Sequence, residues 1–193
     1  MPGSPPGSII QDVTPEAPID DAGAAALALA RATVERYVRS GVVGEPPDGL
    51  AVALGEPGGA FVTLRVRGRL RGCIGTLAAS KPDIAREIVA AAISAASADP
   101  RFAPVGPDEL AALDYEVDIV DALEAVGGLA DLDPRRYGVL VEADGRRGVL
   151  LPDLGGVETA VEQVAIAREK AGLGPGVAVQ LHRFTVRRYR EPQ

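Results

Sequence analysis

The sequence predicts an α+β protein with a mainly antiparallel sheet flanked by helices. Hairpin patterns, in which a short turn joins two strand-like segments, outnumber plausible β-α-β crossovers along the 193 residues. Hydrophobic residues make up 47% of the chain and aromatic residues only 4%. The core must therefore be built from Ala, Val, Leu and Ile, with helices packed closely on the sheet.

The chain is predicted to consist of a flexible tail, residues 1–15, and a single domain, residues 16–190. The opening segment MPGSPPGSIIQ is rich in Pro, Gly and Ser, a composition typical of flexible termini. The total length suits one domain, or one domain with a smaller lobe.

The first predicted helix begins at Asp20 or Asp21, either of which can cap it, and runs to about Ser40. Its apolar stripe consists of Leu27, Ala30, Val34 and either Tyr37 or Val38. Residues 41–59 are rich in Gly and Pro and predict a loop, interrupted by a short apolar run over residues 50–54.

The segment FVTLRVRGRLRGCIGT, Phe61 to Thr76, predicts the antiparallel hairpin around which the chain is organised. Period-two alternation assigns one set of side chains to the core: Val62, Leu64, Val66, Leu70 and Ile74. It assigns a second set to the opposite face: Arg65, Arg67, Arg69, Arg71 and Cys73. Arg67-Gly68 is a turn signal. A two-residue loop would spoil the apolar pairing, so we expect a loop of three or four residues.

Ser80-Lys81-Pro82-Asp83 resembles a capping box that starts the next helix. Its core positions at helical spacing are Ile84, Ile88, Ala91, Ala92 and Ala95. Asp99-Pro100 ends this helix, because the residue before proline resists the α conformation. A short helix is then predicted from Pro107.

The second half of the chain predicts three strands or hairpins and one helix. Tyr115, Val117 and Ile119 alternate with Glu116 and Asp118, which predicts a half-buried strand with its acids on a solvated face. A hairpin over residues 137–151 turns at Asp144-Gly145. The helix at 159–171 is expected to bury Val161, Val164 and Ala165, with Gly172 after its end. A last strand, 177–186, precedes a basic tail of Arg187, Arg188 and Arg190.

Charge and composition exclude several functional classes. A net charge of −7 argues against general affinity for nucleic acids or membrane surfaces. The single cysteine cannot form an internal disulfide and fits a reducing compartment. No segment reaches the roughly 18 apolar residues that a membrane helix needs. The sequence therefore predicts a soluble cytoplasmic protein.

Cys73 is the sharpest candidate for chemistry. Thiolates are nucleophiles, and neighbouring cations favour them. Arg71 lies two residues away on the same predicted face, so we expect a thiol pKa below its ordinary value. The alternative is that Cys73 is a small buried residue of a strand. His182, the only histidine, could serve as its base or simply occupy a strand face. One Cys and one His at this separation predict no metal site.

Anion binding is the second candidate activity. Gly68, Gly72 and Gly75 fit neither the Walker nor the dinucleotide pattern. Arg71 can still clamp a carboxylate or phosphate with two donors, and Arg101 supplies another cation. Alternating arginines repel, so a compensating partner is expected, either an external anion, which we favour, or internal acids such as Glu116 and Asp118. The glycines could instead permit close packing.

Segments distributed over most of the chain are similar to the AMMECR domain family, whose most distinctive motif is centred on LRGCIG. These segments are GAFVTLRVRGRLRGCIGT (59–76), AISAASADPRFAPV (92–105), DELAALDYEVDIV (108–120), GRRGVLLPDLGGVE (145–158) and EKAGL (169–173). The resemblance implies two unequal lobes with the motif lining a cleft. Carried over residue by residue, it implies a site made of Arg71, Gly72, Cys73, Gly75, Thr76, Asp99 and Arg101, with no cofactor specified.

The resemblance also implies partners. Many members accompany Memo-like and radical S-adenosylmethionine proteins, which suggests a shared modification pathway. Many relatives carry a tryptophan early in the C-terminal helical segment and a second cysteine just before KAGL. This sequence has no tryptophan, and Arg168 stands at the position of that cysteine. Three functions remain open. The first is an enzyme that uses Cys73 in a modification reaction, and the second is a module that binds a small anion, a nucleic-acid backbone or a partner peptide without chemistry. A third is a scaffold that docks such a partner.

Overall fold

The computed structural model describes residues 21–191, so the predicted tail and Asp20 lie outside the described residues. The helices are α1 (Asp21–Ser40), α2 (Leu50–Leu54), α3 (Ile84–Ser97) and α4 (Ala160–Lys170), with short 3-10 turns η1 (Leu110–Ala112) and η2 (Leu129–Asp131). The strands are β1 (Ala60–Val66), β2 (Arg69–Gly75), β3 (Leu113–Val120), β4 (Glu124–Val126), β5 (Gly138–Ala143), β6 (Arg146–Leu150), β7 (Gln180–Phe184) and β8 (Val186–Arg190).

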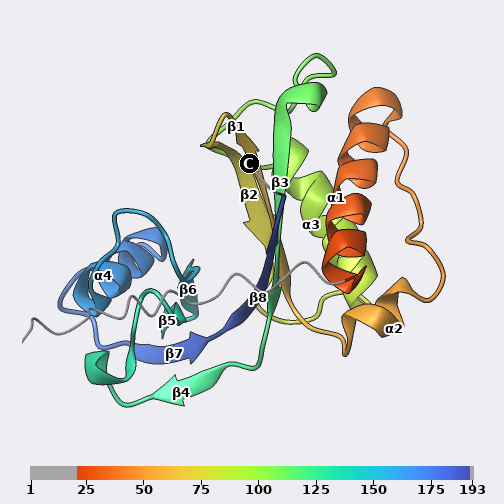
Figure 1. Cartoon of the computed structure of the whole chain (residues 1–193). Coiled ribbons are helices and arrows are strands. Elements are labelled where there is room, and N and C mark those ends of the chain that lie inside the picture. The colour runs from red at the N-terminus through yellow and green to blue at the C-terminus, as the bar shows by residue number, and fades with distance from the viewer. Residues whose placement is uncertain (1–20, 192–193) are drawn as a thin grey trace, which may run out of the picture.

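The strands form two four-stranded antiparallel sheets, in the orders β2-β1-β3-β8 and β4-β7-β5-β6. The first sheet, with α1, α2 and α3, makes the large lobe, residues 21–120 and 186–191. The second sheet and α4 make the small lobe, residues 124–184. Helices α1 and α3 cover the face of the large sheet that points away from the small lobe (Figure 1). The predicted α+β class with two unequal lobes is confirmed.

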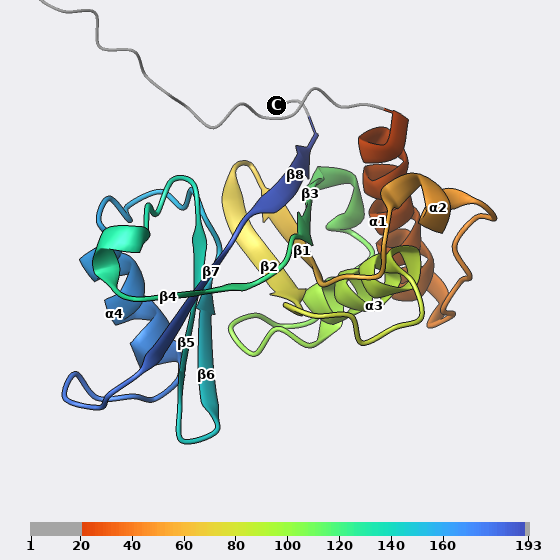
Figure 2. The ribbon, with the colours of Figure 1, turned by 90° about the horizontal axis from the view of Figure 1, so that it is seen from below.

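The chain passes between the lobes twice, from β3 to β4 and from β7 to β8 (Figure 2). The predicted last strand over 177–186 is therefore two strands, because Thr185 interrupts the pairing and each half joins a different sheet. The predicted basic tail lies within β8, where Arg188 pairs in register with Asp118 of β3. No helix among residues 21–191 has the length and apolar character to span a bilayer.

The core of the large lobe confirms the predicted alternation along β1, whereas Leu70 of β2, predicted to lie in the core, lines the cleft between the lobes. Val62 and Leu64 of β1 are fully buried, as is Val117 of β3, and all three belong to one core cluster with the buried alanines of α3. The close approach of α3 to β2 has a steric requirement: a Cβ placed on Gly72 would lie 2.2 Å from the carbonyl oxygen of Ala95. Glycine at this position lets α3 lie directly on β2.

The central hairpin differs from the prediction at its turn. The loop has two residues, Arg67 and Gly68, with φ angles of 51° and 74°, as a tight hairpin turn requires. The register shifts between Leu64 and Arg65, which pair with Gly72 and Leu70, so Arg71 is the extra residue of a β-bulge. The expectation of a longer loop was wrong because the bulge, not the loop, restores the apolar pairing.

Helix α3 begins directly after Asp83, and helix α4 buries a different side from the one predicted. Asp83 caps α3 by accepting the backbone N–H of Arg86 at 2.9 Å, so this helix begins at Ile84. Helix α4 buries Gln163, Val164 and Ala167. The predicted inward positions Val161 and Ala165 are exposed instead, because the side of α4 that contacts the small sheet is centred on Ala167, which packs against Gly148.

Candidate functional site

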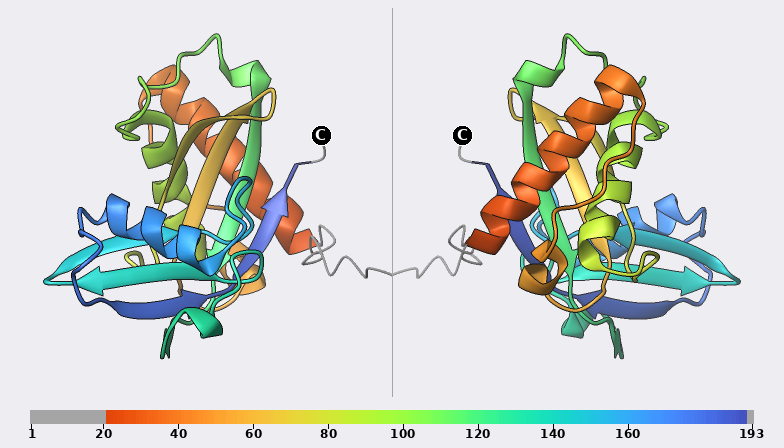
Figure 3. Two further views of the ribbon diagram at one scale, coloured as in Figure 1. Left: turned by 90° about the vertical axis from the view of Figure 1, so that its left-hand side faces the viewer. Right: turned by 90° about the vertical axis from the view of Figure 1, so that its right-hand side faces the viewer.

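A cleft of about 530 Å³ opens between the large sheet and the small lobe. The small sheet and α4 lie across the strands of the large sheet (Figure 3). The apolar part of the cleft comes from Phe61, Leu70, Ile74, Val149, Leu151 and Leu154, and its polar groups come from Thr63, Arg65, Cys73, Asp99, Arg101, Glu116 and Lys170. Both lobes therefore contribute side chains to one concave surface, the usual setting of a small-molecule site.

Cys73 lies in the wall of this cleft, opposite Thr63 in the β1–β2 pairing. The Thr63 hydroxyl donates to Sγ at 3.2 Å. Burial raises the pKa of the Cys73 thiol, and the carboxylates of Asp118 and Glu116 raise it further. The hydrogen bond from the Thr63 hydroxyl and the charge of Arg101 lower it, but by less. The expected lowering of this pKa is contradicted, because desolvation outweighs the nearby cation.

Asp99 and Arg101 follow α3 and hold the strand at Cys73. Asp99 is 4% exposed and accepts from the guanidinium of Arg101 (2.7 Å) and from the backbone N–H of Cys73 (2.9 Å). Arg101 keeps the pKa of the Asp99 carboxyl well below its usual range. The Arg101 side chain is half exposed beside the cleft. The structure therefore brings together three of the site residues that the resemblance implied: Cys73, Asp99 and Arg101.

Two buried acids lie on the cleft face of β3. Glu116 and Asp118 are 3% and 0% exposed, so the prediction that they lie on a solvated face was wrong. The small lobe covers this face, and arginines of β8 neutralise the acids: Arg188 donates to Asp118 at 2.7 Å and Arg190 to Glu116 at 2.7 Å. Burial nevertheless raises the pKa of Asp118 to about 6.

Lys170, at the end of α4, is a functional candidate that residue-by-residue reasoning missed. Its ammonium lines the cleft and donates to the carbonyl oxygen of Val149 at 3.2 Å. Burial lowers the pKa of Lys170, and the positive charge of Arg101 lowers it further. The negative charges of Cys73 and Asp99 raise it, but by less. One signal was available: the chain has 2 lysines against 18 arginines, and this lysine falls within the EKAGL segment.

Arg71 lies outside the cleft. Its bulged position directs the guanidinium to Glu109, with contacts of 2.7 and 2.8 Å, and to the carbonyl oxygens of Ala103 and Pro104. The favoured external anion is contradicted by this internal partner. Glu116 and Asp118, the internal alternatives, pair with other arginines.

The remaining predicted binding residues also lie outside the cleft lining. Gly72 packs against α3, and a Cβ on Gly75 would lie 2.1 Å from the carbonyl oxygen of Ala60. The Thr76 hydroxyl donates to Glu87 at 2.6 Å. The structure supports the alternative in which these glycines permit close packing.

Arg71→Ala is expected to lower the free energy of unfolding by about 2 kcal/mol near neutral pH, because Glu109 and two carbonyls lose their donor. Arg71 lowers the pKa of Glu109 to about 2. The contribution of a lowered pKa is present above the unfolded value and is lost as pH falls through the folded value. The difference should therefore shrink in acid. Urea unfolding tests this, with the exposed Arg69→Ala as control; unchanged stability would contradict it.

Two further predicted positions lie away from Cys73. His182 pairs with Leu140 and Ala125 in the small sheet and does not line the cleft. Arg168 donates to the carbonyl oxygens of Gly174, Pro175 and Val177. Within residues 21–191, no cluster of His, Cys, Asp or Glu could hold a metal ion.

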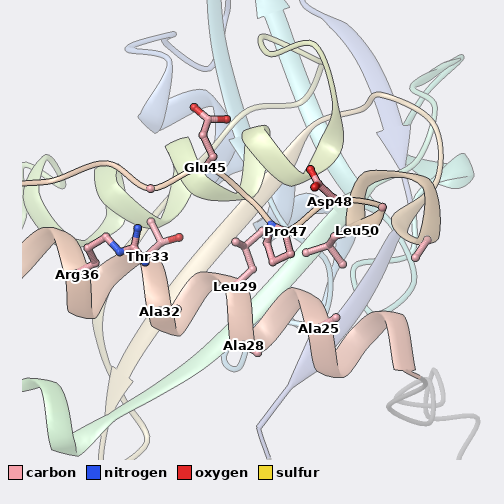
Figure 4. Close-up of a pocket in the computed structure, with 13 residues that line it drawn as sticks. Ala25, Ala28, Leu29, Ala32, Thr33, Arg36, Glu45, Pro47, Asp48 and Leu50 are labelled. Atoms are coloured by element: carbon pink, nitrogen blue, oxygen red, sulfur yellow. The ribbon is translucent and has the colours of Figure 1, made fainter.

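A second hollow of about 600 Å³ lies between α1 and the segment that leads into α2 (Figure 4). Alanines and Leu29 of α1 face Pro47 and Leu50 across it. Among the described residues, the ionisable members of its lining are Arg36, Glu45 and Asp48. The perturbed titratable groups Cys73 and Lys170 line the cleft instead, and Asp118 lies buried on the same face of β3, so the cleft is the better candidate for chemistry.

Comparisons with known proteins cover nearly all of the described chain. The AMMECR1 family model matches residues 27–192. A protein of Thermotoga maritima is 49% identical over 160 residues, 81% of this chain and 92% of that protein. A protein of Clostridium acetobutylicum is 41% identical over 84% of this chain, which spans 35% of that relative's length. The crystal structure of uncharacterized protein PH0010 from Pyrococcus horikoshii matches with a TM-score of 0.81 at 30% identity, covering 90% of this chain and 98% of that one.

Proposed function

This chain belongs to the AMMECR1 family, and we propose that its cleft is an active site in which the Cys73 thiol bonds to a small electrophilic substrate. The observation that carries the proposal is the position of Cys73 in a cleft shared by two lobes, with Thr63 donating to its sulfur. Titratable groups with displaced pKa values, which cluster at functional sites, converge on the same place.

The proposed chemistry is nucleophilic. The thiol loses its proton to solvent base, and the Thr63 hydroxyl stabilises the resulting thiolate by its hydrogen bond. The sulfur electron pair forms a bond to an electrophilic carbon, and the leaving group departs with the pair of the bond that breaks. A modification reaction is completed when an acceptor nucleophile bonds to the same carbon and the C–S bond breaks, so that the sulfur leaves as a thiolate and takes a proton from solvent.

A specific observation favours a second candidate, a binding module that uses the same cleft without covalent chemistry. Burial raises the pKa of the Cys73 thiol, which favours its neutral form, and much of the cleft lining is apolar. A neutral thiol among apolar side chains can act as a small packing residue. The Memo-like and radical S-adenosylmethionine partners that the resemblance implies remain a prediction for either candidate.

Alkylation of Cys73 with iodoacetamide separates the two candidates. The folded protein is expected to react at Cys73, with a rate that rises through a pKa above that of the same thiol in the unfolded chain, because burial disfavours the thiolate. Rates measured across pH by mass spectrometry give both pKa values, and Cys73→Ser checks the site of reaction. A thiol that reacts only in denaturant would remove Cys73 from the chemistry and favour the binding module.

A further inference from the structure

We propose that the cleft selects substrates that carry an anionic group, which Lys170 of the small lobe and Arg101 of the large lobe hold beside Cys73. This inference rests on the proposed function and names the substrate class. The cleft volume, about 530 Å³, falls in the range of pockets for small molecules.

The charges around the cleft support an anionic ligand. Its lining contains three cations, Arg65, Arg101 and Lys170, and two acids, Asp99 and Glu116. On a protein of net charge −7, this is a local excess of positive charge. Arg101 pairs with Asp99 and Arg65 lies 4.0 Å from Glu116, so the surplus positive charge is that of Lys170, which attracts ligands of the opposite sign.

The acids of the cleft are already engaged by other groups. Glu116 accepts from Arg190 at 2.7 Å, and Asp118 accepts from Arg188 at 2.7 Å. The Asp99 carboxylate accepts hydrogen bonds from the Arg101 guanidinium and from the Cys73 backbone N–H. Among residues 21–191, none of these acids forms an ion pair with Lys170, whose ammonium donates only to the carbonyl oxygen of Val149. An ammonium has three donors, so two remain for a ligand.

Lys170 and Arg101 are brought together by tertiary structure. Lys170 ends α4, Arg101 follows α3, and both line the cleft that contains Cys73. The two cations repel, which contributes to the lowered pKa of Lys170. An anion bound between them would relieve that repulsion and link the lobes. Phe61, Leu70 and Leu154 would contact the apolar body of the substrate.

Two alkylating agents that differ in charge test the inference. Iodoacetate is anionic and iodoacetamide is neutral, and both transfer a carbon to sulfur with loss of iodide. The ratio of their rates at Cys73, iodoacetate over iodoacetamide, is expected to be about 5-fold higher in the folded protein than in the unfolded chain, as one solvent-exposed ion pair predicts. Because both reagents attack the same thiolate, its pKa cancels from the ratio.

Lys170→Met should return this ratio to within about two-fold of the unfolded chain, since the favourable charge contact is lost. Lys170→Arg should retain it, and Lys81→Met, at the only other lysine, should leave it unchanged. A normal iodoacetamide rate without iodoacetate preference would overturn the anion inference and leave the proposed function intact. A folded thiol that is inert to both reagents would overturn both.

Discussion

Arg188→Met is expected to lower the free energy of unfolding by about 3–5 kcal/mol near neutral pH, the usual cost of removing one partner of a buried ion pair. Arg188 is 12% exposed and donates to both oxygens of Asp118, at 2.7 and 3.2 Å, and to the carbonyl oxygen of Pro152. Its loss removes the cation that is hydrogen-bonded to the fully buried Asp118, which lies next to the carboxylate of Glu116. Methionine fills most of the volume, so the effect is electrostatic.

The pH dependence gives this prediction a sign. Burial raises the pKa of Asp118 to about 6 in the wild type, and loss of Arg188 must raise it further. A group whose folded pKa is raised contributes stability below its unfolded pKa and loses it as pH rises through the folded value. The deficit of Arg188→Met should therefore be small in acid and grow as pH rises past about 6.

Urea unfolding of both proteins across this pH range measures the deficit. Arg188→Met combined with Asp118→Asn provides the control, because a neutral amide should recover part of the lost stability and flatten the pH dependence. A deficit below about 1 kcal/mol, typical of an exposed ion pair, would contradict the burial of the Asp118 carboxylate.

The sequence predicted what local alternation determines. Val62, Leu64 and Val117 follow a period of two, and the structure places them in one core. Alternation could not reveal the bulge at Arg71, because nothing in the residue types marks where the extra residue of a bulge stands. The bulge nevertheless reverses the face to which the side chains between it and the hairpin turn point. Because of this reversal, Leu70 lies in the cleft and Arg71 lies outside it. Arg71 was the cation expected to lower the pKa of the Cys73 thiol, so that expectation lost its basis.

The site was harder to predict because its faces depend on the second lobe. Glu116 and Asp118 alternate with apolar residues as in a solvated strand, and only the small lobe and β8 make them buried. Lys170 reaches the cleft from a helix almost 100 positions after Cys73, so no spacing rule connects the two. The resemblance named Cys73, Asp99 and Arg101 as site residues from two separate segments, and only the structure shows that they lie side by side.

Gly72→Ala is expected to lower the free energy of unfolding by about 3 kcal/mol, at the upper end for overpacking of a core. The added Cβ would lie 2.2 Å from the carbonyl oxygen of Ala95 and 3.2 Å from its carbonyl carbon. Both atoms belong to the backbone of α3, so no side-chain rotation can relieve the contact. Either α3 or β2 must move.

This substitution distinguishes packing from ligand binding as the reason for glycine in the LRGCIG motif. A glycine that serves only to admit a bound anion can become alanine with little cost in stability, whereas the packing role predicts a large cost without any ligand. Gly174→Ala, where a Cβ would meet no atom within 4 Å, is the matched control and should be nearly neutral. Equal midpoints for the two variants in urea unfolding would contradict the packing role. A selective loss for Gly72→Ala would instead show that glycine keeps β2, and with it Cys73, in place against α3.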